Sequence, residues 1–217
     1  NAQILIAHGE YVLARELLKQ AHFVEPSNFR IFHLWGDSYW LEKQFEEALF
    51  YYQKCIYLHE DGDIHFKLAR TYSALGQEDE SCNHWYVGLQ WPGHKTSELF
   101  EAYKDLGNHA LRHGDVDEAE EYYNRAFAIN PQSDVLLTNY GSLDIQRGEW
   151  GKAFQRFQTA LKINKKCEKA WIGLALTYQF NGEIQQAWNC LGHALEIDPQ
   201  QEIALELIQD WWKKQTY

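Results

Sequence analysis

The sequence predicts an all-α fold in which antiparallel helix pairs stack one after another. The phrase "AFAINPQ" at 126–132 returns as "ALEIDPQ" at 194–200, so that Pro131 and Pro199 lie 68 positions apart, twice a period of 34. Within this period, apolar residues recur at helical spacing in two separate stripes. A fixed period of this length is typical of arrays of one repeated helical unit.

The unit at 168–201 shows the repeat pattern most clearly. Its defining residues are Trp171, Leu174 and Tyr178, then Gly182, then Ala187, Leu191 and Ala194, and finally Pro199. The two apolar stripes predict two helices, and small residues at unit positions 8 and 20 let their backbones approach closely. The glycine permits the turn between the helices, and the proline stops the second one. Because one pair cannot bury both of its faces, neighbouring pairs must stack.

The other units follow in order along the chain. A partial unit at 1–28 keeps only the back half, with Gly9, Ala14, Ala21 and Pro26. The unit at 29–61 has Phe32, Gly36, Tyr39, Ala48 and Tyr52. The unit at 62–99 has Leu68, Ala69, Tyr72 and Gly76, then drifts and ends with a short insertion at 96–99. The missing front of the first unit leads us to expect that further sequence precedes Asn1 in the parent protein or was lost from it.

The last two regular units precede a terminal helix. The unit at 100–133 has Tyr103, Leu106, Gly114, Ala119, Tyr123, Ala126 and Pro131. The unit at 134–167 has Leu137, Gly141, Gly148, Ala153 and Phe157, with Lys165 in place of the proline. Residues 202–217 are expected to form a capping helix.

Composition narrows the classes of function. Of 217 residues, 45% are hydrophobic, which predicts a folded chain, and the net charge of −11 disfavours binding to nucleic acid or to anionic membranes. No apolar run approaches the ~20 residues that a membrane helix needs, so no membrane insertion is expected. The four cysteines are scattered, which favours reduced thiols in a cytoplasmic location over a disulfide framework.

Several units in one phase resemble the tetratricopeptide repeat (TPR) family, and the resemblance covers nearly the whole chain. It implies a right-handed superhelical solenoid of stacked helix pairs that serves as a platform for protein–protein binding. We therefore expect a non-catalytic interaction scaffold without a cofactor. The alternative is a partner- or substrate-recruiting regulatory region of a larger multidomain enzyme, such as a transferase.

The resemblance also implies where a partner binds, because the first helix of each pair lines the concave face in this family. The polar residues at those positions are Lys67, Arg70, Lys104, Asn108, Arg112, Thr138, Asn139, Ser142, Gln146 and Lys169. These side chains suit a peptide or helix with an acidic segment. The opposing interpretation is a merely solvated face, since charges at these spacings are ordinary on exposed helices.

A sharper form of this hypothesis is capture of a partner's C-terminal carboxylate. Chaperone-adaptor members of the family clamp a carboxylate with five side chains, and Lys104, Asn108, Asn139 and Lys169 match the first four. The fifth place, an arginine in the family, is Gly173 here, which removes a charge-assisted contact.

Catalytic and metal sites are not expected. His109 and His113 are four residues apart on one helix face, a spacing that can hold zinc, but zinc takes about four ligands and the HExxH motif is incomplete. We therefore interpret both as helix histidines near a repeat interface.

The capping helix carries more apolar residues than a solvated end needs. We expect Leu205, Ile208 and Trp212 to pack on the last unit, while Ile203, Leu207 and Trp211 point away. Such an exposed patch would contact either a following domain or a second copy of the chain, as in a homodimer. The alternative is that all of these side chains pack onto the array.

Overall fold

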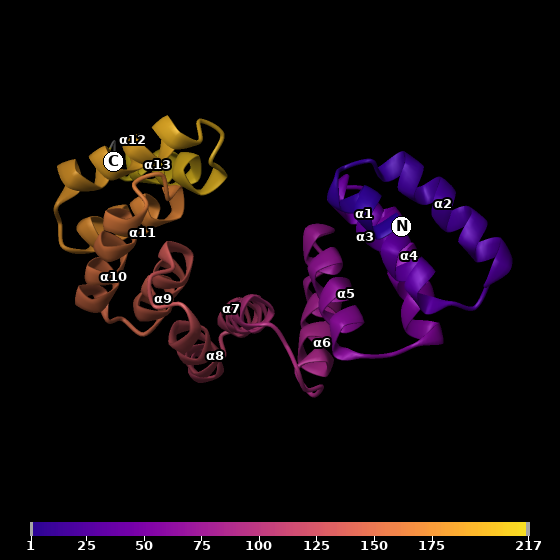
Figure 1. Cartoon of the computed structure of the whole chain (residues 1–217). Helices are drawn as coiled ribbons and strands as arrows, with labels where there is room; N and C mark the ends of the chain where they lie inside the picture. The colour runs from indigo at the N-terminus through magenta and orange to yellow at the C-terminus, as the bar shows by residue number, and fades with distance from the viewer. Residues whose placement is uncertain (1, 216–217) are drawn as a thin grey trace. The chain divides into compact units, whose positions relative to one another are not determined.

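The computed structural model describes residues 2–215, with side chains through Lys213. Those residues form thirteen helices and no strand, which confirms the predicted all-α class (Figure 1). The chain divides into two compact units, Asn1–His109 and Ala110–Tyr217, with the division inside helix α7. We call them unit 1 and unit 2 and describe each by itself.

Unit 1 contains α1 to most of α7. These helices are α1 (Ala2–Ala7), α2 (Tyr11–Val24), α3 (Phe29–Leu41), α4 (Phe45–Leu58), α5 (Gly62–Ala74), α6 (Glu78–Gly88) and α7 (Thr96–Arg112). Helices α3 and α4 pack as one pair and α5 and α6 as the next, and α4 also packs on α5. The pairs therefore stack in chain order.

Unit 2 repeats this arrangement. Its helices are α8 (Val116–Ile129), α9 (Asp134–Gln146), α10 (Trp150–Ile163), α11 (Glu168–Phe180), α12 (Ile184–Ile197) and α13 (Glu202–Gln215). Helices α9 and α10 form one pair and α11 and α12 another, with α10 against α11 and α13 against α12.

Capping residues fix where several first helices begin. The side chains of Asn28, Asp61 and Ser133 accept hydrogen bonds from the first-turn N–H groups of α3, α5 and α9. Helix α7 begins at Thr96, four residues before the start of its sequence unit, because the Lys95 N–H donates to the Glu98 carboxylate at 3.1 Å. The segment expected as an insertion is thus the first turn of α7.

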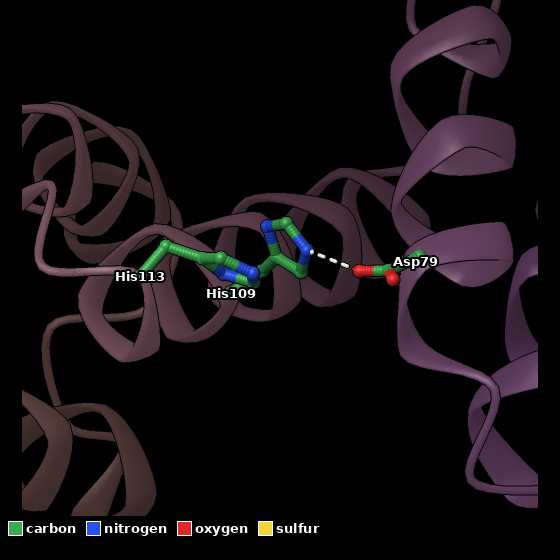
Figure 2. A group of neighbouring side chains, drawn as sticks. All are labelled: Asp79, His109 and His113. Carbon is green, nitrogen blue, oxygen red and sulfur yellow. Dashed lines mark hydrogen bonds and ion pairs between the residues drawn. The ribbon is translucent and has the colours of Figure 1, made fainter.

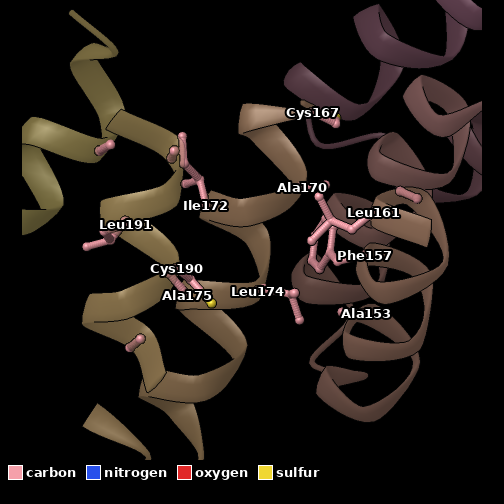
Figure 3. Packing of buried hydrophobic residues seen from close by; sticks show 14 of the residues in the cluster. Ala153, Phe157, Leu161, Cys167, Ala170, Ile172, Leu174, Ala175, Cys190 and Leu191 are labelled. Atoms are coloured by element: carbon pink, nitrogen blue, oxygen red, sulfur yellow. The ribbon is translucent and has the colours of Figure 1, made fainter. Parts of the chain in front are cut away.

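An aromatic ring between glycines organises the core of unit 2. A Cβ atom added at either Gly141 on α9 or Gly173 on α11 would collide with the ring of Phe157 on α10. Ala153, one turn before Phe157, is 0% exposed, as its small-residue position predicts (Figure 3). In unit 1, Gly36 makes the same close approach to Tyr52. Three helices can meet only because these positions have no side chain.

The turn inside each pair requires a left-handed backbone. Gly148 and Gly182 have φ angles of 74° and 78°. The equivalent position in the pair α3–α4 is Lys43, with φ of 61°. A side chain in this conformation costs about 1–2 kcal/mol, which glycine avoids.

A histidine pair joins α5 to α6 inside unit 1. Nδ1 of buried His65 lies 2.9 Å from Nδ1 of His84, and Nε2 of His65 lies 2.9 Å from Glu60 Oε1. The His84 ring also stacks on Tyr72. Only one proton fits between two facing Nδ1 atoms. Burial, together with the charge that His65 can carry, lowers the pKa of His84 to about 4.

We predict that Lys43→Gly stabilises the protein by about 0.5–1 kcal/mol, because relief of the left-handed strain exceeds the added entropy of the unfolded chain. Urea denaturation measures this change. As the matched control, Gly148→Ala should destabilise by about 1 kcal/mol, since it introduces the same strain. A Lys43→Gly variant no more stable than wild type would contradict the prediction.

We also predict an acid-dependent loss of stability that originates at His84. Its folded pKa lies below the ordinary value of 6.5, so its contribution is fully present above pH 6.5 and is lost as the pH falls toward 4. Chemical denaturation across this range should show a smaller loss for His84→Phe than for wild type. His193→Phe, at a half-exposed histidine of unit 2, is the control and should follow wild type.

Candidate functional site

The inner face of unit 1 contains two adjoining pockets, which we call the unit 1 groove. The first pocket, of about 660 Å³, is lined by Gln3, Ile6, Ala7, Phe29, Arg30, His33, Leu34, Asp37, His59, Asp61 and Asp63. The second pocket, of about 310 Å³, is lined by Ile6, Asp37, Trp40, Leu41, Tyr52, Lys67 and Arg70. Both therefore share Ile6 and Asp37, and most of their lining comes from α1, α3 and α5, the first helices of successive pairs.

Asp37 is the centre of a hydrogen-bond network in this groove. Its Oδ1 accepts from the Tyr52 hydroxyl and from Lys67 Nζ, both at 2.7 Å. Its Oδ2 lies 3.5 Å from His33 Nδ1. Burial, reinforced by the Asp37 charge, raises the pKa of Tyr52, so the hydroxyl keeps its proton and donates it.

His33 extends the network to the next helix pair. Its Nε2 lies 2.8 Å from Oδ2 of Asp63 on α5. This hydrogen bond is the main cause that lowers the pKa of Asp63, with burial opposing it and Lys67 assisting. Asp63 is consequently ionised at neutral pH and keeps the first pocket acidic.

The sequence-predicted cations of unit 1 differ in how they are held. Lys67 lines the second pocket, but Asp37 offsets its charge. Arg70 is exposed and places its guanidinium 4.8 Å from the centre of the Trp40 ring. The sequence analysis did not identify Asp37 as the partner of Lys67, because the two are 30 residues apart on different helices.

Lys104 is less available than expected. Its side chain is only 18% exposed, and Nζ lies 2.7 Å from Glu101 Oε2 and 3.4 Å from Asp105 Oδ1. Burial alone would lower the pKa of Lys104, but these two carboxylates outweigh it and raise the pKa. Asn108, one turn later, is half-buried. The carboxylates of Glu101 and Asp105 on the same helix therefore offset much of the positive charge of Lys104.

Unit 2 contains the remaining predicted residues. Arg112, Ser142, Gln146 and Lys169 are exposed, and Asn139 is half-buried. The expectation that Thr138 contacts a partner is wrong. Thr138 is 4% exposed, and its hydroxyl donates to the Asp134 carbonyl at 2.8 Å, because its helix face turns toward Cys167 of the neighbouring pair.

Gly173 cannot be replaced by a longer side chain without rearrangement. Its Cα faces the Phe157 ring, and an added Cβ would collide with that ring. At the position where the family's clamp has an arginine, the Phe157 ring thus fills the space that a side chain would need.

The histidines on α7 have a carboxylate neighbour that the sequence analysis missed. His109 Nε2 lies 2.9 Å from Oδ1 of Asp79 on α6, and His113 follows one helical turn later (Figure 2). Each of the three side chains has a ligand atom within 4.8 Å of the others. Zinc takes about four ligands, and the Asp79 side chain is 79% exposed. The absence of a metal here stays a prediction.

Helix α13 packs in a different phase from the expected one. Trp211 is 5% exposed and belongs to the core of unit 2, and Leu207 and Ile208 pack against it. The expectation that Leu207 and Trp211 point away is therefore wrong. Ala204, which is fully buried, brings α13 close to α12 and sets the stripe 204, 207, 208, 211. Ile203, Leu205 and Trp212 are the exposed apolar residues of this helix.

Three of the cysteines, Cys55, Cys167 and Cys190, are buried thiols outside any disulfide. Burial raises the pKa of Cys55 to about 12 and that of Cys190 to about 11, which keeps both protonated at neutral pH.

Among the helices in residues 2–215, none has the length and apolar character needed to cross a bilayer.

Comparison with known proteins identifies similar chains of several kinds. Stress-induced-phosphoprotein 1 of Caenorhabditis elegans is 23% identical over 234 residues, covering 94% of this chain and 71% of that protein. Human protein O-mannosyl-transferase TMTC3 is 24% identical, covering 91% of this chain and 22% of that protein. The chain spans less than half the length of several other curated relatives that it matches.

Solved structures with the same fold include two that are matched over nearly their whole length. The type IV pilus biogenesis factor PilW is 17% identical with a TM-score of 0.70, covering 95% of this chain and 94% of that one. YrrB, described as a TPR protein with an unusual peptide-binding site, is 16% identical with a TM-score of 0.66, covering 90% and 99%. At these identities the similarity shows the fold.

Family models test the repeats directly. Models described as "Tetratricopeptide repeat" match residues 29–61, 100–133 and 144–209, together more than half of the chain. With the repeated helix pairs and the glycine–aromatic packing already described, the chain belongs to the tetratricopeptide repeat family.

Proposed function

We propose that this chain is a non-catalytic scaffold that holds a segment of a partner protein in its concave groove. The TPR fold is generally a protein-interaction scaffold, and the observation that carries the proposal for this chain is the unit 1 groove. Its two pockets lie side by side on the inner faces of α1, α3 and α5, with polar groups fixed by Asp37. Fixed polar groups between apolar walls suit an extended peptide, because little side-chain ordering remains to be done on binding.

Unit 2 contributes further candidate contacts. Asn139, Ser142 and Gln146 can each hydrogen-bond a peptide backbone, and exposed Lys169 can meet an acidic residue. A partner with an acidic segment therefore remains our proposal, with Lys169 as a candidate contact in unit 2. The scaffold is proposed to work in the cytoplasm, where buried Cys55 and Cys190 stay reduced.

A second candidate function is a recruiting region of a larger enzyme. The observation that favours it is the similarity to TMTC3, of which the chain matches about a fifth. The parent reading frame beyond residues 1 and 217 decides between the candidates. A transferase domain in that frame would support the second one.

The groove proposal predicts that a bulky residue at Ala7 blocks binding. Ala7 is exposed and lines the first pocket, so Ala7→Trp fills the groove without disturbing the core. Peptides selected by wild type from a displayed random library should bind Ala7→Trp at least about tenfold more weakly, a difference of roughly 1.4 kcal/mol. Fluorescence anisotropy measures the affinity.

The matched control is Ala21→Trp on α2, which is exposed but lines neither pocket. It should bind the selected peptides as wild type does. Equal affinity for Ala7→Trp and wild type would show that the peptides bind elsewhere.

Capture of a C-terminal carboxylate is the finer form of the proposal, and it predicts sensitivity to the free tail. Amidation of the C-terminal carboxylate of a selected peptide should weaken its binding to wild type. In the double variant Lys104→Glu, Lys169→Glu, the acid and amide forms of the peptide should bind with equal affinity. Circular dichroism of the double variant checks that helicity is intact. Amide and acid forms that bind wild type equally well would rule out tail capture but not groove binding.

A further inference from the structure

The second pocket of the unit 1 groove combines apolar walls with cationic side chains. Ile6 of α1, Trp40 and Leu41 of α3 and the largely buried ring of Tyr52 supply the apolar surface. Lys67 and Arg70 of α5 supply the positive charges. At about 310 Å³ the pocket is at the small end of the ~300–1,000 Å³ range of ligand pockets, so it suits one large side chain better than a helix.

The two cations of this pocket are not equivalent. Lys67 Nζ is 2.7 Å from Asp37 Oδ1, so its charge is offset inside the pocket. Arg70 lies over the Trp40 ring, and no carboxylate of the residues with described side chains is recorded within ion-pair distance of it. The pocket therefore carries one positive charge for which the described part of the chain supplies no counter-ion.

The geometry at Arg70 suits a carboxylate ligand. A guanidinium presents its N–H groups in a planar fork that matches a carboxylate, and it is more weakly hydrated than an ammonium. Stacking on Trp40 restricts its orientation and lowers the cost of fixing it in a complex. In a chain with a net charge of −11, a local unpaired cation of this kind is what allows an acidic ligand to approach.

The other end of the groove has the opposite polarity. Asp61 and Asp63 line the first pocket, where His33 keeps Asp63 ionised and Asp61 caps α5. A carboxylate is repelled there and attracted to Arg70. The charge pattern thus fixes at which end an acidic group binds.

We propose that the Arg70 pocket anchors a partner segment through an apolar side chain immediately next to a carboxylate. The apolar side chain packs between Ile6, Trp40 and Leu41, and the carboxylate pairs with Arg70. This inference rests on the proposed function and names the chemistry of its ligand. The carboxylate belongs either to the C-terminus of the partner or to an aspartate or glutamate side chain.

Small probes test this pocket directly on the full chain. N-acetylphenylalanine supplies an aromatic side chain and a terminal carboxylate, and N-acetylphenylalaninamide lacks the charge. Acetyl-Phe-Asp-amide places the carboxylate on a side chain instead. NMR titration that follows the indole N–H of Trp40 and the guanidinium N–H of Arg70 gives the affinity of each.

We expect both carboxylate probes to bind about tenfold or more tightly than the neutral amide, the effect of one charge-assisted pair. In Arg70→Gln this ratio should fall to about one. Lys19→Gln on α2 is the matched control, because it removes one exposed positive charge of unit 1 that lines neither pocket and should leave the ratio unchanged. The tighter of the two carboxylate probes identifies the source of the carboxylate.

The inference would be overturned by no binding of any probe at 10 mM, by no preference for carboxylates in wild type, or by an undiminished preference in Arg70→Gln. Tighter binding of N-acetyl-phosphotyrosinamide than of both carboxylates would likewise contradict it. If it fails while Ala7→Trp still weakens selected peptides, the groove proposal stands. If Ala7→Trp has no effect on those peptides, the groove proposal itself fails.

Discussion

The close approach of three helices around one aromatic ring is the constraint on which the rest of the structure depends. In unit 2, Phe157 of α10 lies between the backbones of α9 and α11, at Gly141 and Gly173. In unit 1, Tyr52 of α4 makes a similar close approach to Gly36 of α3, within one helix pair. Because these contacts fix the spacing of successive helix pairs, they also fix which side chains meet across the inner face.

The consequence is a set of polar contacts between equivalent helices of neighbouring pairs. His33 of α3 with Asp63 of α5, and Lys67 of α5 with Asp37 of α3, are both pairs of residues 30 positions apart. Such contacts do not drive folding, since partly exposed ion pairs contribute about 0–1 kcal/mol. They instead determine the charge of the groove, because each one removes a cation or an anion from contact with a ligand.

The fold could be predicted from the sequence almost entirely, whereas the candidate site could be predicted only in part. The spacing of small and apolar residues is local information, and Ala119 and Ala153 are fully buried as that spacing requires. The pairing of Lys67 with Asp37 depends on how two helices are juxtaposed, which spacing within one unit does not specify. The same limit applies to α13, where the buried Ala204 rather than the largest side chains decided which face packs.

Thr138 shows a related limit. Its position in the repeat places it near the inner face, but a short β-branched side chain can satisfy its hydroxyl on its own helix and turn inward. A longer polar residue at that position would have reached the solvent. Position in the repeat therefore does not by itself predict whether a side chain is accessible to a ligand.

The packing at Gly173 also limits how this protein can evolve. A substitution that adds a side chain at 173 gains nothing while the Phe157 ring occupies the space, and a smaller residue at 157 alone leaves a cavity between three helices. Each single change therefore costs stability. The residues at 157 and 173 are consequently constrained together, because a side chain fits at 173 only if the ring at 157 is made smaller.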